Sequence, residues 1–390
     1  MSDPCPAVEL EFRDVSKRYP GAAEHVIEHL SFHVPAGDIC VLVGPSGCGK
    51  TTAMRMVNRM IDITDGDILL GGESVRSKAP AELRRTIGYA IQQIGLFPHL
   101  TVGDNIATVP KLLGWDKARI RARIDELLEL VSLDPDETRD RYPGQLSGGM
   151  RQRVGVARAL AADPPLMLMD EPFGAIDPIN RERLQNEFLR LQADIKKTIV
   201  FVTHDIDEAI KMGDRVAVLK KGGVLAQYAP PAELLMAPAD EFVEDFVGAD
   251  RALKRLALQR VRDIDLWKVA TVQVGDPVEE VRAKIEDADL NIALLVDDQR
   301  RPLGWLSDGA FRADRIRRDL RSPAQPLVEL DDILRDALSD LLSSETRYAP
   351  VVDSRGAVTG ALSLEVISHV LHDHQASLNV PDSADLLAKS

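Results

Sequence analysis

Residues 44–51 read Gly44-Pro45-Ser46-Gly47-Cys48-Gly49-Lys50-Thr51, and this stretch decides the fold of the chain. The apolar run 38–43 precedes it, and Thr52 with the helical pattern 52–57 follows it. In such a loop, backbone N–H groups turn inward around phosphates, the lysine bridges the outer two phosphates and the threonine hydroxyl holds Mg²⁺. The helix that follows favours an anion at its N-terminus. The sequence therefore predicts an α/β nucleotide-binding domain whose phosphate ligands are residues 44–52 and whose metal ligands include Thr51.

Length and composition limit the classes of protein to which the chain can belong. The 390 residues are 45% hydrophobic, which is enough for two or three domains with cores of their own. A net charge of −14 argues against nucleic acid as the main partner and against electrostatic adhesion to an anionic membrane. The chain has no apolar run of 18 residues, and its first residues do not resemble a signal peptide. The spacing of Cys5, Cys40 and Cys48 matches no metal site and predicts no disulfide framework.

Periodicity along residues 8–247 predicts one α/β domain. Alternation over 8–18 and the runs 26–34, 66–72 and 87–91 indicate strands, and an apolar face over 116–131 indicates a helix. A second helix is expected to begin at Ser147 and end near residue 162. The continuous apolar runs 166–169 and 199–202 are typical of strands buried on both faces of a parallel sheet. We therefore expect a parallel sheet with a helical insertion over about residues 93–162.

The remainder of the chain contains an internal repeat. After a charged pattern over 251–269, which predicts a helix, Val296-Asp297 matches Val352-Asp353 at an offset of 56 residues. Gly304 matches Gly360 at the same offset, and each copy reads as helix, strand, polar turn and strand. Two copies favour a paired, pseudo-twofold α+β module over a longer array. We expect the first copy over 252–310, the second over 322–373, and a loosely ordered polar tail over 374–390.

Two carboxylates follow the apolar run 166–169, at Asp170 and Glu171. Strands that end at a nucleotide place their last side chains beside the metal. Asp170 therefore suits a water-mediated hold on Mg²⁺, and Glu171 suits the general base that orients water toward the terminal phosphate of ATP. A carboxylate pair is a weak signal by itself, but beside a phosphate-binding loop it is a strong one.

A third motif, Ser147-Gly148-Gly149, opens a helix and so forms an anion-binding N-terminus. Together with the loop and the carboxylates it resembles the ABC-type ATPases, a P-loop NTPase family, over about residues 8–245. The resemblance implies head-to-tail homodimers in which these three residues cap the terminal phosphate bound by the other protomer. We name Ser147, Gly148 and Gly149 the signature tip.

The same resemblance implies roles for four further residues. Tyr19 corresponds to the aromatic residue that stacks on adenine, and Gln92 to the glutamine that contacts Mg²⁺ and couples to the membrane subunit. Asp177 corresponds to the interface loop, where Gly174 and Ile176 depart from the usual residues. His204 corresponds to the switch histidine that holds the terminal phosphate, and it follows an apolar strand as Glu171 does.

Two stretches, 91–100 and 109–115, resemble importers for quaternary amines such as glycine betaine, carnitine and choline, and the C-terminal pair resembles tandem CBS modules. This resemblance implies permease subunits in the membrane, a separate substrate-binding protein and a position at the cytoplasmic face. Aromatic residues make up 4% of the chain, which is little for the aromatic cages that bind quaternary ammonium groups. We therefore expect the amine to bind elsewhere in the transporter.

Several alternatives stay open at the level of the sequence. The solute can be another small molecule, such as an amino acid, or the chain can be a ligand-sensing ATPase without transport. Nucleotide-binding CBS copies usually carry an aspartate where Ala310 and Val366 stand here, which argues against nucleotide sensing. The arginine-rich run 312–321 fits an anionic lipid surface or a solvated linker.

Overall fold

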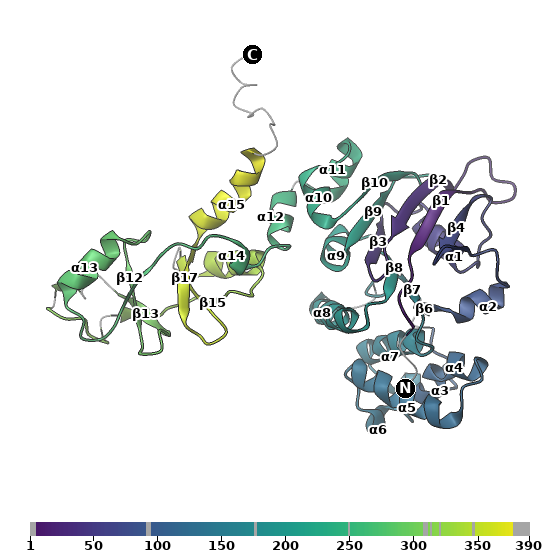
Figure 1. The fold of residues 1–390 in the computed structure, drawn as a ribbon, viewed down its shortest axis with the longest axis horizontal. Coiled ribbons are helices and arrows are strands. Elements are labelled where there is room, and N and C mark those ends of the chain that lie inside the picture. Colours follow the sequence, from purple (N-terminus) through teal and green to yellow (C-terminus); the bar gives the residue numbers. More distant parts are fainter. Residues whose placement is uncertain are drawn as a thin grey trace, which may run out of the picture. The chain divides into compact units, whose positions relative to one another are not determined.

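The computed structural model describes residues 5–90, 95–174, 178–248, 250–306, 311–312, 314–319, 321–344 and 348–376. Its contacts divide the chain into two compact units, Met1–Ala249 and Asp250–Ser390, and each is described by itself (Figure 1). Among the described residues, no helix is both long enough and apolar enough to cross a membrane.

An antiparallel sheet begins the first unit. It contains β1 (Leu10–Lys17), β2 (Ile27–Val34), β4 (Asp65–Leu70) and β5 (Glu73–Ser74), in the order β2-β1-β4-β5. The alternation seen in the sequence places Leu10, Phe12 and Val15 in the core, where the Phe12 ring stacks on Phe32 with centroids 4.5 Å apart. This sheet packs over one face of the helix that follows the phosphate-binding loop, because both contribute to one hydrophobic cluster.

The central sheet of the first unit carries the predicted site. Its strands are β3 (Ile39–Val43), β6 (Ile87–Ala90), β7 (Leu166–Asp170), β8 (Thr198–Val202), β9 (Arg215–Leu219) and β10 (Leu225–Ala229), in the order β10-β9-β3-β8-β7-β6. The strands from β9 to β6 run parallel, and β10 is antiparallel. Every residue of β3, β7 and β8 is buried, as their continuous apolar runs predict. The carboxyl ends of these three neighbouring strands therefore meet at one edge of the sheet, where ligands of such sheets bind.

Helices cover this sheet and extend beyond it. They are α1 (Lys50–Val57), α2 (Pro80–Arg85), α8 (Pro178–Ile195), α9 (Ile206–Met212), α10 (Pro231–Met236) and α11 (Glu241–Val247). In Figure 1, α1 lies by the antiparallel sheet and α8 lies by the other side of the central sheet. The two hydrophobic clusters of the unit reflect this, since residues of α1 belong to one and residues of α8 to the other.

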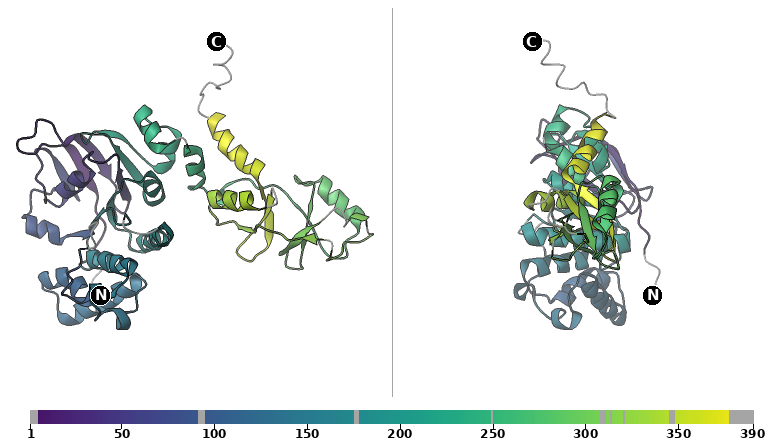
Figure 2. Two further views of the ribbon diagram at one scale, coloured as in Figure 1. Left: turned by 180° about the vertical axis from the view of Figure 1, so that it is seen from behind. Right: turned by 90° about the vertical axis from the view of Figure 1, so that its left-hand side faces the viewer.

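The expected helical insertion forms a lobe of its own beside the central sheet, as the views in Figures 1 and 2 agree. It contains α3 (Val102–Ile106), α4 (Thr108–Leu112), α5 (Lys117–Leu130), α6 (Pro135–Thr138), the short 3₁₀ helix η1 (Pro143–Gln145) and α7 (Gly148–Leu160). Asn105 is buried and fixes the segment 97–101, which leads into the lobe, because its amide nitrogen donates to the carbonyls of Phe97, Leu100 and Thr101. Helix α7 begins at the surface, where Ser147 and Gly148 are exposed.

The second unit contains the internal repeat as two copies with one topology. The first has β11 (Ala270–Val272), α13 (Val278–Glu286), β12 (Ala293–Val296) and β13 (Pro302–Leu306). The second has β15 (Val328–Glu329), α14 (Leu334–Ser343), β16 (Tyr348–Val352) and β17 (Val358–Ser363), followed by α15 (Leu364–Ala376). In each copy the first strand pairs parallel with the second and the second pairs antiparallel with the third.

The two copies exchange short segments. Ser322, in the short strand β14 (Arg321–Ser322) before β15, pairs with Trp305 of β13 in the first copy. Trp267, before β11, forms an antiparallel bridge with Ala361 of β17 in the second copy. A shared cluster that includes Leu294, Trp305 and Val358 fills the space between the copies. The repeats therefore form one module with a pseudo-twofold relation.

The predicted helix over 251–269 is wrong in its length. The helix α12 ends early (Arg251–Leu256), and a 3₁₀ helix, η2 (Val261–Asp263), follows. Leu256 and Val261 are buried in the core of the second copy, and Trp267 exchanges both backbone hydrogen bonds with Ala361. These long-range contacts stabilise an extended backbone in place of a longer helix, and the charged pattern of the sequence does not predict them.

Candidate nucleotide-binding site

The phosphate-binding loop lies between β3 and α1, at the carboxyl edge of the central sheet. A cleft at this edge is lined by side chains or backbone of eight residues from three strand ends: Ser46, Gly47, Gly49, Lys50, Thr51, Thr52, Glu171 and His204. The first six come from the loop and the first turn of α1, and the last two follow β7 and β8. The structure therefore brings the loop, the predicted base and the predicted switch histidine together around one space.

Two glycines of the loop are required by its backbone. Gly49 has φ of 103°, and a Cβ there would lie 2.8 Å from the Val26 carbonyl oxygen. A Cβ on Gly44 would lie 2.3 Å from the carbonyl oxygen of Leu219. An L side chain would meet backbone atoms at both positions, so the loop can turn this tightly only with glycine.

Lys50 opens α1 and is 7% exposed. Its ammonium donates to the carbonyl oxygens of Gly44 at 2.7 Å and Pro45 at 3.1 Å, which solvates a buried charge within the loop. Cys48 is fully buried behind the loop, with its sulfur 3.8 Å from the Lys50 nitrogen. The lysine is thus held at the loop by bonds that phosphate oxygens can replace.

Thr51 and Asp170 meet at the base of the cleft. The Thr51 hydroxyl donates to Asp170 Oδ1 at 3.1 Å, and Arg55 lies 4.0 Å from the other carboxylate oxygen. Burial raises the pKa of Asp170 above its usual value, while the Thr51 hydroxyl and Arg55 oppose this shift. The described residues contain no group of three or more His, Cys, Asp or Glu that could hold a metal by themselves. A hydroxyl and one carboxylate suit Mg²⁺, which is commonly held by few protein oxygens together with substrate phosphates and water.

Glu171 and His204 face one another across neighbouring strand ends. Glu171 has φ of 45°, a conformation that is costly for a side chain of this size and is found at functional sites. Its backbone N–H donates to the Val202 carbonyl at 2.9 Å, which ties the end of β7 to the end of β8. Glu171 Oε1 lies 3.3 Å from His204 Nδ1. This turn therefore aims the carboxylate and the imidazole at the same space beside the loop.

The signature tip forms the start of α7, as predicted, because the Ser147 hydroxyl accepts the Met150 N–H at 3.3 Å. Ser147 and Gly148 are exposed, and the described lining of the cleft contains no residue of the tip. Tyr19 is 38% exposed, lies with its ring 5.2 Å from the Lys17 ammonium, and is also not among the lining residues. Gln92 and Asp177 lie outside the described residues.

One buried polar pair near the site was not predicted from the sequence. Gln185 of α8 donates its amide to Glu208 of α9 at 3.0 Å, and both side chains are buried. Burial raises the pKa of Glu208, and hydrogen bonds from Thr203 and Gln185 act against this. Because Glu208 also accepts a hydrogen bond from Thr203, the pair connects α8 to the residue directly before His204. In the sequence, Glu208 looks like an ordinary charged residue of a short helix, so no local signal marks it.

A parallel sheet with a glycine-rich loop after β3, two carboxylates after β7 and a histidine after β8 defines a P-loop nucleotide-binding domain. Comparisons with known proteins identify the kind. The family model described as "ABC transporter" matches residues 27–174. The "Osmoprotectant import ATP-binding protein OsmV" of Salmonella typhimurium is 46% identical over 382 residues, covering 96% of this chain and 100% of that protein.

Two further comparisons agree. The "Glycine betaine/carnitine/choline transport ATP-binding protein OpuCA" of Bacillus subtilis is 42% identical over 93% of this chain and 96% of that protein. A solved structure titled "Dimeric structure of a post-hydrolysis state of the ATP-binding cassette MJ0796 bound to ADP and Pi" has a TM-score of 0.51 and 30% identity, covering 57% of this chain and 98% of that one. The chain belongs to the ABC transporter family, as one of its ATP-binding subunits.

This membership confirms the resemblance inferred from the three motifs, and the likeness to subunits of quaternary-amine importers is confirmed as well. As a member of the family, the chain is an ATPase subunit of a transporter. The P-loop fold of the first unit is also confirmed.

Proposed function

We propose that this chain powers the import of a compatible solute, a quaternary amine such as glycine betaine, carnitine or choline, through a partner permease. The observation that carries the proposal is the likeness to osmoprotectant and amine transport subunits, which extends over both units rather than the ATPase unit alone. The position would be peripheral, at the cytoplasmic face of the membrane, through contact with the permease.

The chemistry would follow from the residues around the cleft. Lys50 and the backbone N–H groups of the loop would bind the phosphates of ATP. Mg²⁺, held by Thr51 and Asp170, would neutralise charge on the outer two phosphates. Glu171 would accept a proton from the attacking water, and His204, 3.3 Å from its carboxylate, would contact the terminal phosphate and hold the carboxylate in place. Gln92 is proposed as a further metal contact, and Tyr19 as the adenine contact.

We further propose that two copies share two ATP sites. The exposed position of the signature tip supports this, because Ser147 and Gly148 present an open helix N-terminus away from the lining of their own cleft. Asp177 would lie in the loop at the interface between copies. The dimeric state of the related cassette, as its title gives it, supports the same assembly.

The second unit is proposed to be a tandem CBS module that regulates the ATPase unit, with copies over 252–310 and 322–373 following the ATPase domain over 8–247 in the sequence. Support comes from its two topologically equal copies and from the strands that they exchange. A separate substrate-binding protein is proposed to hold the amine. The Trp305 side chain is 2% exposed, and Arg119 covers the Trp115 ring with its guanidinium 3.5 Å from the ring centroid, so neither offers an open aromatic face.

The first experiment tests the assigned base in the complex of the chain with its permease. Glu171→Gln should keep ATP binding and lower turnover by about 100-fold or more, because general-base catalysis is worth that much. Glu137→Gln is a suitable control, because that carboxylate lies on the lobe with 72% of its side chain exposed. Undiminished hydrolysis by Glu171→Gln would refute the assignment.

The second experiment tests the cargo. Uptake of labelled glycine betaine, choline, carnitine and proline would be measured in cells with and without the gene. Loss of amine uptake alone supports the proposal, while loss of proline uptake alone would move the cargo to an amino acid. Unchanged uptake of all four solutes, with hydrolysis intact, would favour a regulatory ATPase.

A further inference from the structure

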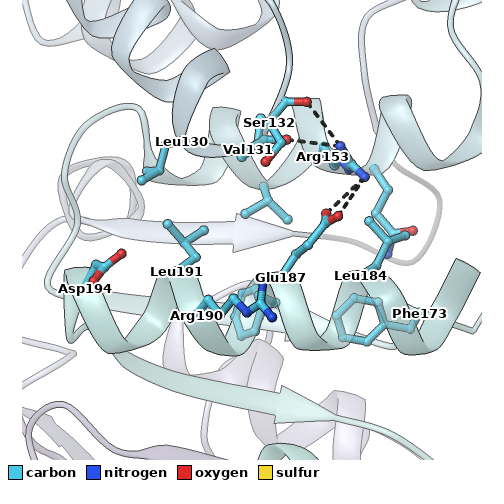
Figure 3. A pocket seen from close by; sticks show the side chains of 13 residues that line it. Leu130, Val131, Ser132, Arg153, Phe173, Leu184, Glu187, Arg190, Leu191 and Asp194 are labelled. Atoms are coloured by element: carbon cyan, nitrogen blue, oxygen red, sulfur yellow. Dashed lines mark hydrogen bonds and ion pairs between the residues drawn. The ribbon is translucent and has the colours of Figure 1, made fainter. Parts of the chain in front are cut away.

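Arg153 connects three elements of the first unit through one guanidinium group (Figure 3). Its Nη2 lies 3.0 Å and 3.2 Å from the two carboxylate oxygens of Glu187 on α8. Its Nη1 donates to the carbonyl of Ser132 at 3.2 Å and more weakly to that of Val131 at 3.5 Å. The side chain of Arg153 is 15% exposed and that of Glu187 is 33% exposed. The pair is therefore partly shielded from water, where an ion pair is stronger than at the surface.

The Nη1 group of Arg153, its first arm, contacts the end of another helix, α5. Val131 is the C-cap of α5, and Ser132 adopts a left-handed conformation with φ of 57°. The last carbonyls of a helix have no partner inside the helix and carry its negative end. A guanidinium group satisfies both needs, so Arg153 fixes the end of α5 against α7, inside the helical lobe.

The Nη2 group, its second arm, contacts Glu187 of α8 and so connects the lobe to the part of the unit that contains the central sheet. A Cβ on Gly149 of the signature tip would lie 4.0 Å from Leu184 Cδ1 of α8, so the first turn of α7 already lies close to this helix. One turn further along α7, Arg153 meets Glu187, three residues after Leu184. The contact between α7 and α8 thus runs from the tip to the ion pair.

The helix α8 is in turn anchored to the turn that carries the predicted base. Phe173, two residues after Glu171, packs edge-on against Phe188 of α8 with centroids 6.3 Å apart, and it also contacts Phe201 of β8. A continuous chain of contacts therefore runs from the signature tip through Arg153, Glu187 and Phe188 to the turn that carries Glu171.

Apolar packing covers only part of this contact. A pocket of ≈ 200 Å³ that opens to the surface lies between α5, α7 and α8, and its walls include Leu130, Leu184 and Leu191 (Figure 3). Across this pocket the apolar side chains of the helices do not make the contacts that would fix the angle between them. At its rim, the planar guanidinium with its fixed geometry contributes to how α7 lies on α8.

We propose that Arg153 is a positioning residue for the ATP site shared between two copies: by holding Glu187 and the end of α5, it sets the orientation of the signature tip relative to the Glu171 turn. This inference rests on the proposed function, because the tip acts on ATP only in a dimer. Arg153 is not among the described residues that line the cleft, and it acts through the helix that carries the tip.

The test compares binding with turnover in the full-length chain. Arg153→Gln should leave the affinity of the cleft for a fluorescent ATP analogue within about twofold, because the loop is untouched. It should lower kcat by about tenfold or more, since small misplacements of a positioned group cost up to about 100-fold. In a Glu171→Gln background, it should also lower the fraction of ATP-induced dimer. Glu187→Gln should reproduce these effects, and the double variant should add little to either.

Two further variants separate positioning from loss of stability. Arg153→Lys keeps the charge but cannot serve both arms, so its kcat should lie between those of the wild type and Arg153→Gln. Arg123→Gln is the matched control: its side chain is 18% exposed and pairs with Glu126, Asp163 and the Leu160 carbonyl, none of which belongs to α8. It should lower Tm as much as Arg153→Gln does while changing kcat by less than about twofold.

The outcomes are distinguishable. An unchanged kcat in Arg153→Gln, or a fall no larger than that of Arg123→Gln at equal loss of Tm, would overturn the positioning role and leave the proposed function standing. A wild-type chain with an active permease complex that never pairs on ATP would overturn both. Retained analogue affinity together with a tenfold fall in kcat supports the role.

Discussion

The two units of this chain build their interiors differently. Among the residues that the structure describes, the buried polar or charged side chains belong to the first unit with one exception, Ser363. Those of the first unit are Ser16, Lys50, Asn58, Asn105, Thr138, Asp170, Gln185, Gln192, Lys197, Thr198, Thr203 and Glu208. Several of them lie at the carboxyl edge of the central sheet, where the cleft is. The second unit is held together by apolar clusters shared within and between its two copies.

The difference follows from the free-energy cost of burying polar groups. Burying a polar group costs free energy unless each group finds a partner, so a fold retains such groups where they are paired and useful. In the second unit, ion pairs such as Arg262–Asp331 and Arg317–Asp319 have both side chains more than half exposed. Substitutions of the buried charged groups of the first unit should therefore have large effects, and substitutions in the exposed pairs of the second unit small ones.

The largest expected effect is at the loop. Lys50→Ala should weaken ATP binding by at least about 100-fold, because hydrogen bonds to charged groups contribute about 1.5–3 kcal/mol each and the lysine would make two of them. Titration calorimetry with MgATP measures this. Lys220→Ala, which removes a partly exposed lysine paired with Asp240, is the control and should bind normally. Equal ATP affinities of Lys50→Ala and Lys220→Ala would contradict the large effect expected at the loop.

The next effect concerns an ion pair of the first unit in which the lysine is buried. Lys197 is 3% exposed, and its ammonium lies 2.8 Å from Asp163 Oδ1 and donates to the Cys5 carbonyl at 2.6 Å. Asp163→Asn should lower the free energy of unfolding by about 2–3 kcal/mol, because it removes the charge partner of a buried ammonium. Calorimetry measures this on the transition that ATP shifts upward, which identifies the first unit. Asp136→Asn, at a carboxylate with 95% of its side chain exposed, should change little.

The same pair predicts a pH dependence. Burial alone would raise the pKa of Asp163, but the hydrogen bonds from Lys197 and the Cys5 N–H outweigh it and hold that pKa below its usual value. The ionised carboxylate therefore stabilises the fold above the unfolded pKa of about 4, and this contribution is lost as the pH falls through the lower folded pKa. The difference between the wild type and Asp163→Asn should shrink below about pH 4. A constant difference across that range would contradict the assigned ion pair.

A smaller effect is expected from removing the second unit. A chain without residues 252–390 should hydrolyse ATP within about twofold of the intact chain at low salt, because its chemistry lies in the first unit. Because the second unit is proposed to regulate the ATPase unit, any stimulation of hydrolysis by salt should vanish in the shortened chain. Both are read from one salt titration of ATPase activity with the permease present. A large fall in the basal rate of hydrolysis would mean that the second unit contributes to the chemistry, and the expected difference between the two units would then be wrong.

The smallest effect is expected at the surface of the second unit. Arg262→Gln breaks the exposed pair with Asp331 and should change the free energy of unfolding by no more than about 0.5 kcal/mol, the usual size for such pairs. The second calorimetric transition reports it. A loss comparable to that of Asp163→Asn would mean that the two units do not differ in their use of charge.

Much of the site could be read from the sequence because its signals are local. The loop 44–51 needs glycine at fixed positions, the carboxylates directly follow an apolar strand, and the signature tip is a helix start with its own cap. The offset of 56 residues likewise predicted two copies, which the structure contains as two sets of one topology. The helix expected over 251–269 failed because contacts with Ala361 and the core of the second copy hold those residues in another conformation.

By itself, the sequence determined the phosphate-binding loop, the carboxylates Asp170 and Glu171 and the start of the helix at Ser147, because each is encoded by neighbours in the chain. Only the tertiary structure decided which strand ends meet, that His204 faces Glu171, that Gln185 pairs with buried Glu208, and that Arg153 holds Glu187. Those pairings join residues that are distant in the chain, and a single side chain in a helix carries no periodic signal of the partner that folding brings to it.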